Sequence, residues 1–201
     1  FWDEETDRKC ETMVLHDSRL PGGRDLADKE LSYLIATHTK AAGQVLAIVD
    51  SCHSGTITRM AKAIPRTAAP NNVPVSFEDF LGSETYKKEG KFRHPPVGTP
   101  IPLSACRPEQ LAMEMPMNGV NRGLFSWFLI ETMNSMDLAA SSYAELIDRV
   151  RVMVKNQYRK QDVFAGATGS ADLHQRFLNG KLKRSRAYVM HFDDKLRYYV
   201  D

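Results

Sequence analysis

The stretch that decides the fold expected of this chain is Val45-Leu-Ala-Ile-Val-Asp-Ser-Cys-His-Ser-Gly55. Its first five residues are all apolar, which predicts a strand buried on both faces of a sheet. The polar residues that follow place a thiol, Cys52, just past the carboxyl end of this strand, where open α/β sheets bind ligands. Gly55 permits a tight turn, so that a substrate backbone can approach the thiol. The stretch therefore predicts a central strand and a candidate nucleophile.

The residues before this strand indicate an α/β arrangement. A strand is expected at 12–16 and a loop at 17–25. Asp28 is expected to cap a helix that runs to about Lys40, because Leu31, Leu34, Ile35 and His38 recur at helical spacing. Strand, helix and strand in this order predict a βαβ unit and hence a largely parallel sheet.

The second half of the chain predicts three elements. We expect a strand at 101–106, a core helix at 123–133 that is apolar nearly all round, and an amphipathic helix at 141–158. The amphipathic helix has a capping box of Ser142 and Glu145, and one apolar face made of Tyr143, Leu146, Ile147, Val150 and Val154.

The connection at residues 56–100 contains six of the ten prolines and is expected to be mostly irregular. A long irregular segment inside a compact domain is usually functional or cleavable. Its candidate processing sites are the basic residues Arg59, Arg66, Lys87, Lys88, Lys91 and Arg93. We expect one domain over 1–178, followed at 179–201 by a β-hairpin that begins another module.

Composition excludes several functional classes. With 201 residues and 42% apolar content, one domain with its own core is expected. Lys and Arg exceed Asp and Glu by only 27 − 25 = 2, which argues against a nucleic-acid partner. No run approaches 18 apolar residues, so no membrane span is predicted. The chain opens on Phe1 without an initiator Met, which indicates a piece of a longer protein.

Three cysteines without a CxxC pair argue against a disulfide framework or a zinc site. This pattern favours a reducing compartment, the cytoplasm. Cys10 and Cys106 are expected to be inert packing residues, whereas the context of Cys52 favours a reactive thiol. No metal site or cofactor is predicted.

The motif Asp50-Ser-Cys-His-Ser-Gly55 after an apolar strand resembles the metacaspases and the related bacterial caspase-like peptidases. Residues 15–31 are similar to the stretch that follows the catalytic histidine loop in bacterial members. Leu103-Ser-Ala-Cys-Arg-Pro-Glu-Gln110, then Glu114 and then Gly123-Leu-Phe-Ser126, resemble their small-subunit half. The resemblance covers residues 1 to about 178.

This resemblance implies a three-layer α/β/α caspase-like sandwich with a mostly parallel central sheet. It implies a cysteine endopeptidase with a Cys–His dyad that cleaves protein or peptide substrates after Arg or Lys. Cys52 would be the nucleophile, and Asp50 would line the pocket for the basic side chain. Ser104, Asp3 and Asp7 are further candidates for substrate binding. An activating protein or an upstream protease is an expected partner, and Ca²⁺ activation is left open.

Two departures from the family pattern affect this interpretation. The family's Ser-Gly-His-Gly loop does not occur, so the partner histidine is expected upstream of Phe1. Arg107-Pro108 stands where relatives often carry acidic residues. The alternative interpretation is a catalytically silent domain that acts as a scaffold or regulatory switch. A nucleotide-binding domain is disfavoured, because no Gly-rich phosphate loop follows a strand.

Overall fold

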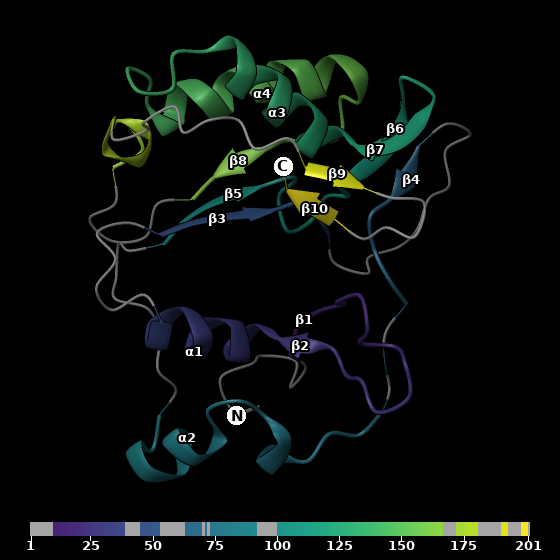
Figure 1. Ribbon diagram of the computed structural model, residues 1–201, viewed down its shortest axis with the longest axis vertical. Coiled ribbons are helices and arrows are strands. Elements are labelled where there is room, and N and C mark those ends of the chain that lie inside the picture. The colour runs from purple at the N-terminus through teal and green to yellow at the C-terminus, as the bar shows by residue number, and fades with distance from the viewer. Residues whose placement is uncertain are drawn as a thin grey trace.

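The computed structural model describes residues 10–38, 45–52, 63–69, 71, 73–91, 100–166 and 172–180, and the backbone of 190–192 and 198–200 (Figure 1). Within these ranges the chain forms four helices and several small sheets. No helix in this part of the chain is long and apolar enough to cross a membrane.

One sheet contains both parallel and antiparallel pairs. β3 (Val45–Val49) runs parallel to β5 (Pro100–Ser104), and β5 pairs in the antiparallel sense with β8 (Phe164–Ala165). The in-register pairing of Val49 with Ser104 brings the carboxyl ends of β3 and β5 to the same edge. Residues that follow β3 therefore lie next to residues that follow β5.

A second three-stranded sheet is entirely antiparallel. Its central strand is β6 (Met113–Met117), with β4 (Ile64–Pro65) on one side and β7 (Val120–Gly123) on the other. Asn118 and Gly119 form the turn between β6 and β7, with φ values of 52° and 81°. Two successive residues with positive φ are typical of a tight hairpin turn whose twist matches its strands.

Helices α3 (Leu124–Ser135) and α4 (Tyr143–Gln157) lie together on one side of the β3–β5–β8 sheet (Figure 1). The main core lies between them and β5, which contributes the fully buried Ile101 and Leu103. The short 3-10 segment η3 (Phe177–Gly180) closes the core, with Phe177 against the Tyr143 ring.

α1 (Asp28–His38), α2 (Ser83–Glu89) and the 3-10 segment η2 (Phe77–Asp79) lie on the other side of that sheet (Figure 1). Phe77 of η2 and Tyr86 of α2 pack against a smaller core made of Ala27 and Phe80. The buried Glu30 carboxylate accepts hydrogen bonds from Arg24 and from the backbone N–H groups of Ala27 and Leu81. These contacts connect α1 to the segment that precedes α2.

The expected three-layer sandwich with a mostly parallel central sheet is wrong. The described sheets have two or three strands each, and only β3 and β5 run parallel. The predicted βαβ unit fails because β1 (Thr12–Met13) pairs with β2 (Leu26–Ala27) in the antiparallel sense, not with β3. Asp25 favours this return of the chain, since its carboxylate binds both Arg19 and Thr12 across the intervening loop.

Several local predictions also need correction. β3 is not buried on both faces, since Ile48 is 48% exposed, and β3 is the edge of the described sheet and not a central strand. In α1 the buried residues are Lys29, Glu30 and Ala36, not the predicted apolar stripe. α3 is not packed into the core on every side, because its Ile130 side chain is exposed. α2 forms within the connection that was expected to be irregular.

Other predictions are confirmed. α4 has the expected capping box: Ser142 Oγ accepts from the Glu145 N–H at 3.1 Å, and Glu145 Oε2 accepts from the Ser142 N–H at 2.8 Å. Its buried face contains all five predicted residues. Near the end of the chain, β9 (Met190–Phe192) pairs in the antiparallel sense with β10 (Tyr198–Val200), and the rest of the predicted hairpin lies outside the described residues.

Candidate active site

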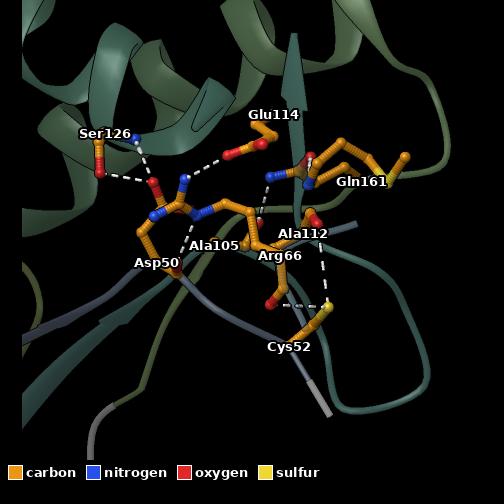
Figure 2. A network of polar contacts seen from close by, with 9 residues as sticks. Asp50, Cys52, Arg66, Ala105, Ala112, Glu114, Ser126 and Gln161 are labelled. Atoms are coloured by element: carbon orange, nitrogen blue, oxygen red, sulfur yellow. Dashed lines mark hydrogen bonds and ion pairs between the residues drawn. The ribbon is translucent and has the colours of Figure 1, made fainter. Parts of the chain in front are cut away.

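Cys52 lies three residues beyond β3, half-buried against the main core. Its backbone N–H donates to the Arg66 carbonyl oxygen at 3.1 Å. Its Sγ lies 3.5 Å from that same oxygen and 3.8 Å from the Ala112 carbonyl oxygen (Figure 2). Burial raises the pKa of the Cys52 thiol, and the positive charge of Arg66 acts in the opposite direction. A base is therefore needed to generate the thiolate near neutral pH.

Arg66 directly follows β4 and is bound through both its backbone and its side chain. Its N–H donates to the Ala112 carbonyl at 2.8 Å, which extends the β4–β6 pairing by one residue. Its guanidinium donates from Nε to the Asp50 carbonyl oxygen at 2.7 Å and reaches Glu114 Oε2 at 3.1 Å. The Nε also lies 3.4 Å from Asp50 Oδ1, so two carboxylates flank this cation (Figure 2).

The Asp50 carboxylate lies at the N-terminus of α3. Its Oδ2 accepts hydrogen bonds from the Ser126 N–H at 3.1 Å and from the Ser126 hydroxyl at 2.5 Å. An anion at this position satisfies an N–H group that the helix leaves unpaired and interacts favourably with the helix dipole. Only a residue without a side chain fits beside it, because a Cβ at Gly123 would lie 2.1 Å from Oδ2.

Gln161 fixes the segment to which the Arg66 backbone donates. Its fully buried side-chain amide donates to the Ala105 carbonyl at 3.0 Å and accepts from the Met113 N–H at 3.1 Å (Figure 2). These two hydrogen bonds connect the chain after β5 to the start of β6. The Ala112 carbonyl is thereby held where it accepts from Arg66.

The structure brings together three of the predicted residues, Asp50, Cys52 and Arg66. Ser104 lies nearby in the fold, at the end of β5 and paired with Val49. Lys87 and Lys88 belong to α2, and Lys91 follows that helix. The remaining predicted residues, Asp3, Asp7, Arg59 and Arg93, lie outside the described residues.

Sequence reasoning missed two parts of this arrangement. Glu114 is predicted only as part of the resemblance to the small-subunit half, and the sequence does not predict its contact with the guanidinium. The β6–β7 hairpin was not expected either, although Asn118-Gly119 between apolar residues is a strong hairpin signal. Recognising that turn would have indicated that Glu114 lies on a strand.

Cys106 differs from Cys52 in its surroundings. It is buried in the main core, and burial raises its thiol pKa to about 12. Such a thiol stays protonated at neutral pH and is a poor nucleophile. Across the described ranges, no group of three or more His, Cys, Asp or Glu residues is placed to hold a metal ion.

Comparisons with solved structures find likeness of low similarity only. No family model and no curated protein matches the chain. The crystal structure of protein GSU0716 from Geobacter sulfurreducens is 20% identical with a TM-score of 0.47, and the match covers 82% of this chain and 66% of that chain. A likeness at this level carries no information on activity.

Proposed function

We propose that this chain is part of a cysteine endopeptidase that cleaves after Arg or Lys, with Cys52 as its nucleophile. One observation carries the proposal. The guanidinium of Arg66 is held by Asp50 and Glu114, while the carbonyl oxygen of the same residue meets the N–H and the Sγ of Cys52. A substrate arginine bound in this way would present its carbonyl to the thiol.

The reaction that follows is acyl transfer. The Cys52 thiolate attacks the substrate carbonyl carbon, and the Cys52 N–H donates to the oxyanion that develops. The amide bond then breaks as the leaving amine takes a proton, and water hydrolyses the thioester. The proton moves through the histidine that the metacaspase resemblance implies. Within the described ranges the partners of Sγ are backbone carbonyls, so this base is not supplied there.

Charge determines the proposed preference for basic residues. Two carboxylates flank the position of the guanidinium, and the Asp50 side chain is only 9% exposed. Charge-assisted hydrogen bonds in such a partly desolvated place are stronger than neutral ones. A substrate aspartate would instead meet like charges there.

A second candidate function is a catalytically silent domain that acts as a scaffold or switch. The raised pKa of the Cys52 thiol favours it, because burial without a base keeps the thiol protonated. In that case the contacts of Arg66 serve only to join β3, β4 and β6. For either function we propose a cytoplasmic location; the proposed peptidase would take protein or peptide substrates and respond to an activating protein or protease.

The test compares fluorogenic peptides that end in Arg, Lys, Gln or Asp, using the full-length protein. We expect cleavage after Arg and Lys and none after Asp. Cys52→Ala should abolish turnover, whereas the matched variant Cys106→Ala should keep it if folded. Turnover by Cys52→Ala would refute the assignment of Cys52 as the nucleophile. A preference for Asp would refute the assignment of Asp50 and Glu114 as a pocket for basic side chains. No turnover of any of the four peptides by folded full-length protein would favour the silent domain.

A further inference from the structure

The edge of β6 has the features of a peptide-binding edge. β4 is only two residues long, and it pairs with β6 through Ile64 with Glu114 and Pro65 with Met113. Arg66 continues this register onto the Ala112 carbonyl. Adding an extended segment to a free strand edge is a common mode of peptide recognition, in which backbone hydrogen bonds supply affinity and pockets supply specificity.

Arg66 fills the positions that a bound arginine would need. Its N–H, its carbonyl and its guanidinium all have partners, on Ala112, Cys52 and the Asp50–Glu114 pair respectively. The preceding residues alternate as in an extended peptide, because Ala63 is buried whereas Ile64 is 49% exposed. Side chains of successive residues in a strand point to opposite faces, so this alternation fits a peptide lying along an edge.

The carboxylate that faces Arg66 is not saturated. Asp50 Oδ1 is buried and accepts no hydrogen bond from the described residues, although the Arg66 Nε lies 3.4 Å away. A buried carboxylate oxygen without a hydrogen bond is costly. The pocket can therefore accept a guanidinium with better geometry than Arg66 supplies.

We propose that the β6 edge at residues 112–114, with Asp50 and Glu114, is a binding site for an extended peptide carrying arginine at the cleavage position. We further propose that residues 63–66 of this chain occupy that site and exclude the substrate. The assignment of Cys52 next to this site rests on the proposed function. The binding and the competition depend only on the contacts of Arg66 and β6.

Tethering makes the built-in segment an effective competitor. Arg66 is only 14 residues from Cys52 in the chain, so its local concentration at the site is high. Short flexible links give effective concentrations of about millimolar. An outside peptide of the same sequence must therefore displace a tethered copy, which weakens its apparent affinity. Removing the arginine of the tethered copy should restore that affinity.

The experiment measures peptide binding by calorimetry in the full-length protein carrying Cys52→Ala, which prevents turnover. The probe is acetyl-Ala-Ile-Pro-Arg-amide, which copies residues 63–66, and its control is the same peptide ending in Gln. Binding is compared with and without Arg66→Gln. The matched control variant is Arg151→Gln, which removes another ion-paired arginine, bound to Asp148 within α4.

We expect Arg66→Gln to lower the Kd of the arginine peptide at least tenfold. Arg151→Gln should leave the Kd unchanged, and the Gln peptide should not bind. An unchanged Kd in folded Arg66→Gln protein, or no binding of the arginine peptide to it, would overturn the proposal. If Arg66→Gln does not fold, Arg66→Lys replaces it. The lysine side chain should hold the site more weakly than Arg66 does, so the Kd of the arginine peptide should fall by a smaller factor. An unchanged Kd would again contradict the proposal.

The outcome separates this inference from the peptidase proposal. Gain of binding in Arg66→Gln, together with no turnover by Arg66→Gln protein that keeps Cys52, would support the peptide site and refute the peptidase. Turnover by the wild-type protein, together with an unchanged Kd in Arg66→Gln, would support the peptidase and refute the occupation of the site by residues 63–66. The two proposals therefore fail independently.

Discussion

Cys106 and Cys52 belong to the same core, and burial acts most strongly on Cys106. Cys106 is a buried member of the main cluster, and burial raises the pKa of its thiol to about 12. Cys52 lies at the margin of this cluster, where a peptide carbonyl reaches its sulfur. The two thiols should therefore differ in their reactivity and in how they couple to stability.

At the residue scale, the pKa of Cys106 predicts a loss of stability at alkaline pH. A raised pKa in the folded state means that folding favours the protonated thiol. Its contribution is complete below the ordinary thiol pKa and is lost as pH rises through about 9 to 12. We expect the free energy of unfolding of the wild-type protein, relative to Cys106→Ala, to fall by at most about 1.4 kcal/mol per pH unit.

Urea unfolding of both proteins between pH 8 and pH 11 measures this difference. All other titrating groups are common to the two proteins, so their effects cancel to a first approximation. A difference that stays constant over this range would contradict the burial of Cys106.

At the scale of elements, the start of α3 depends on Asp50 lying against Gly123. A methyl group at Gly123 must displace the carboxylate, because its Cβ would lie 2.1 Å from Oδ2. We expect Gly123→Ala to cost about 1–3 kcal/mol of stability, the usual range for overpacking. The cost should be smaller in an Asp50→Ala background, where the clash is absent. Denaturant unfolding of the four proteins gives this coupling, and equal costs in both backgrounds would refute it.

Elements with local signals were predictable from the sequence. The cap of α4, its apolar face and the strand at β5 follow from short-range patterns, and the structure contains all three. α1 was located correctly, but its buried face was not: Lys29 and Glu30 are buried, and the Glu30 carboxylate accepts from the Leu81 N–H, whereas Leu31 is only partly buried. Burial of those charges depends on partners such as Arg24 that periodicity does not identify.

The parts that could not be predicted depend on contacts between distant residues. Arg66 and Glu114 are 48 positions apart, and β4 is too short to be recognised before its partner is known. The same applies to the sheet: the apolar run of β3 was compatible with a central strand, yet its described neighbour is β5 alone. Asp50 and Cys52 were identified because both lie within one short motif.

At the scale of the whole molecule, residues 63–66 and α2 offer different sites for processing. Arg66 is extended with its carbonyl against Cys52, whereas Lys87 lies in a helix and pairs with Glu78 and Glu84. Proteolysis favours exposed, extended segments. We therefore expect any activating cut to fall between Arg66 and Thr67. In that step the Cys52 sulfur bonds to the Arg66 carbonyl carbon, the Thr67 amine leaves with a proton, and water releases Arg66 from the thioester.

Intact-mass analysis of active full-length protein tests this processing site. The cut should disappear in Arg66→Gln and in Cys52→Ala, and it should persist in the matched variant Lys88→Gln. An uncut connection in fully active enzyme, or a first cut within α2, would show that Arg66 is not the processing site.

The most direct test of Cys52 as the nucleophile of an arginine-directed peptidase is covalent labelling. Full-length protein is treated with the chloromethyl ketone of acetyl-Ala-Ile-Pro-Arg and with the matched ketone ending in Asp, and the modified peptides are located by mass spectrometry. We predict that the arginine reagent labels Cys52 and that the aspartate reagent does not. Labelling of Cys10 or Cys106 to the same extent, or equal labelling of Cys52 by both reagents, would contradict it.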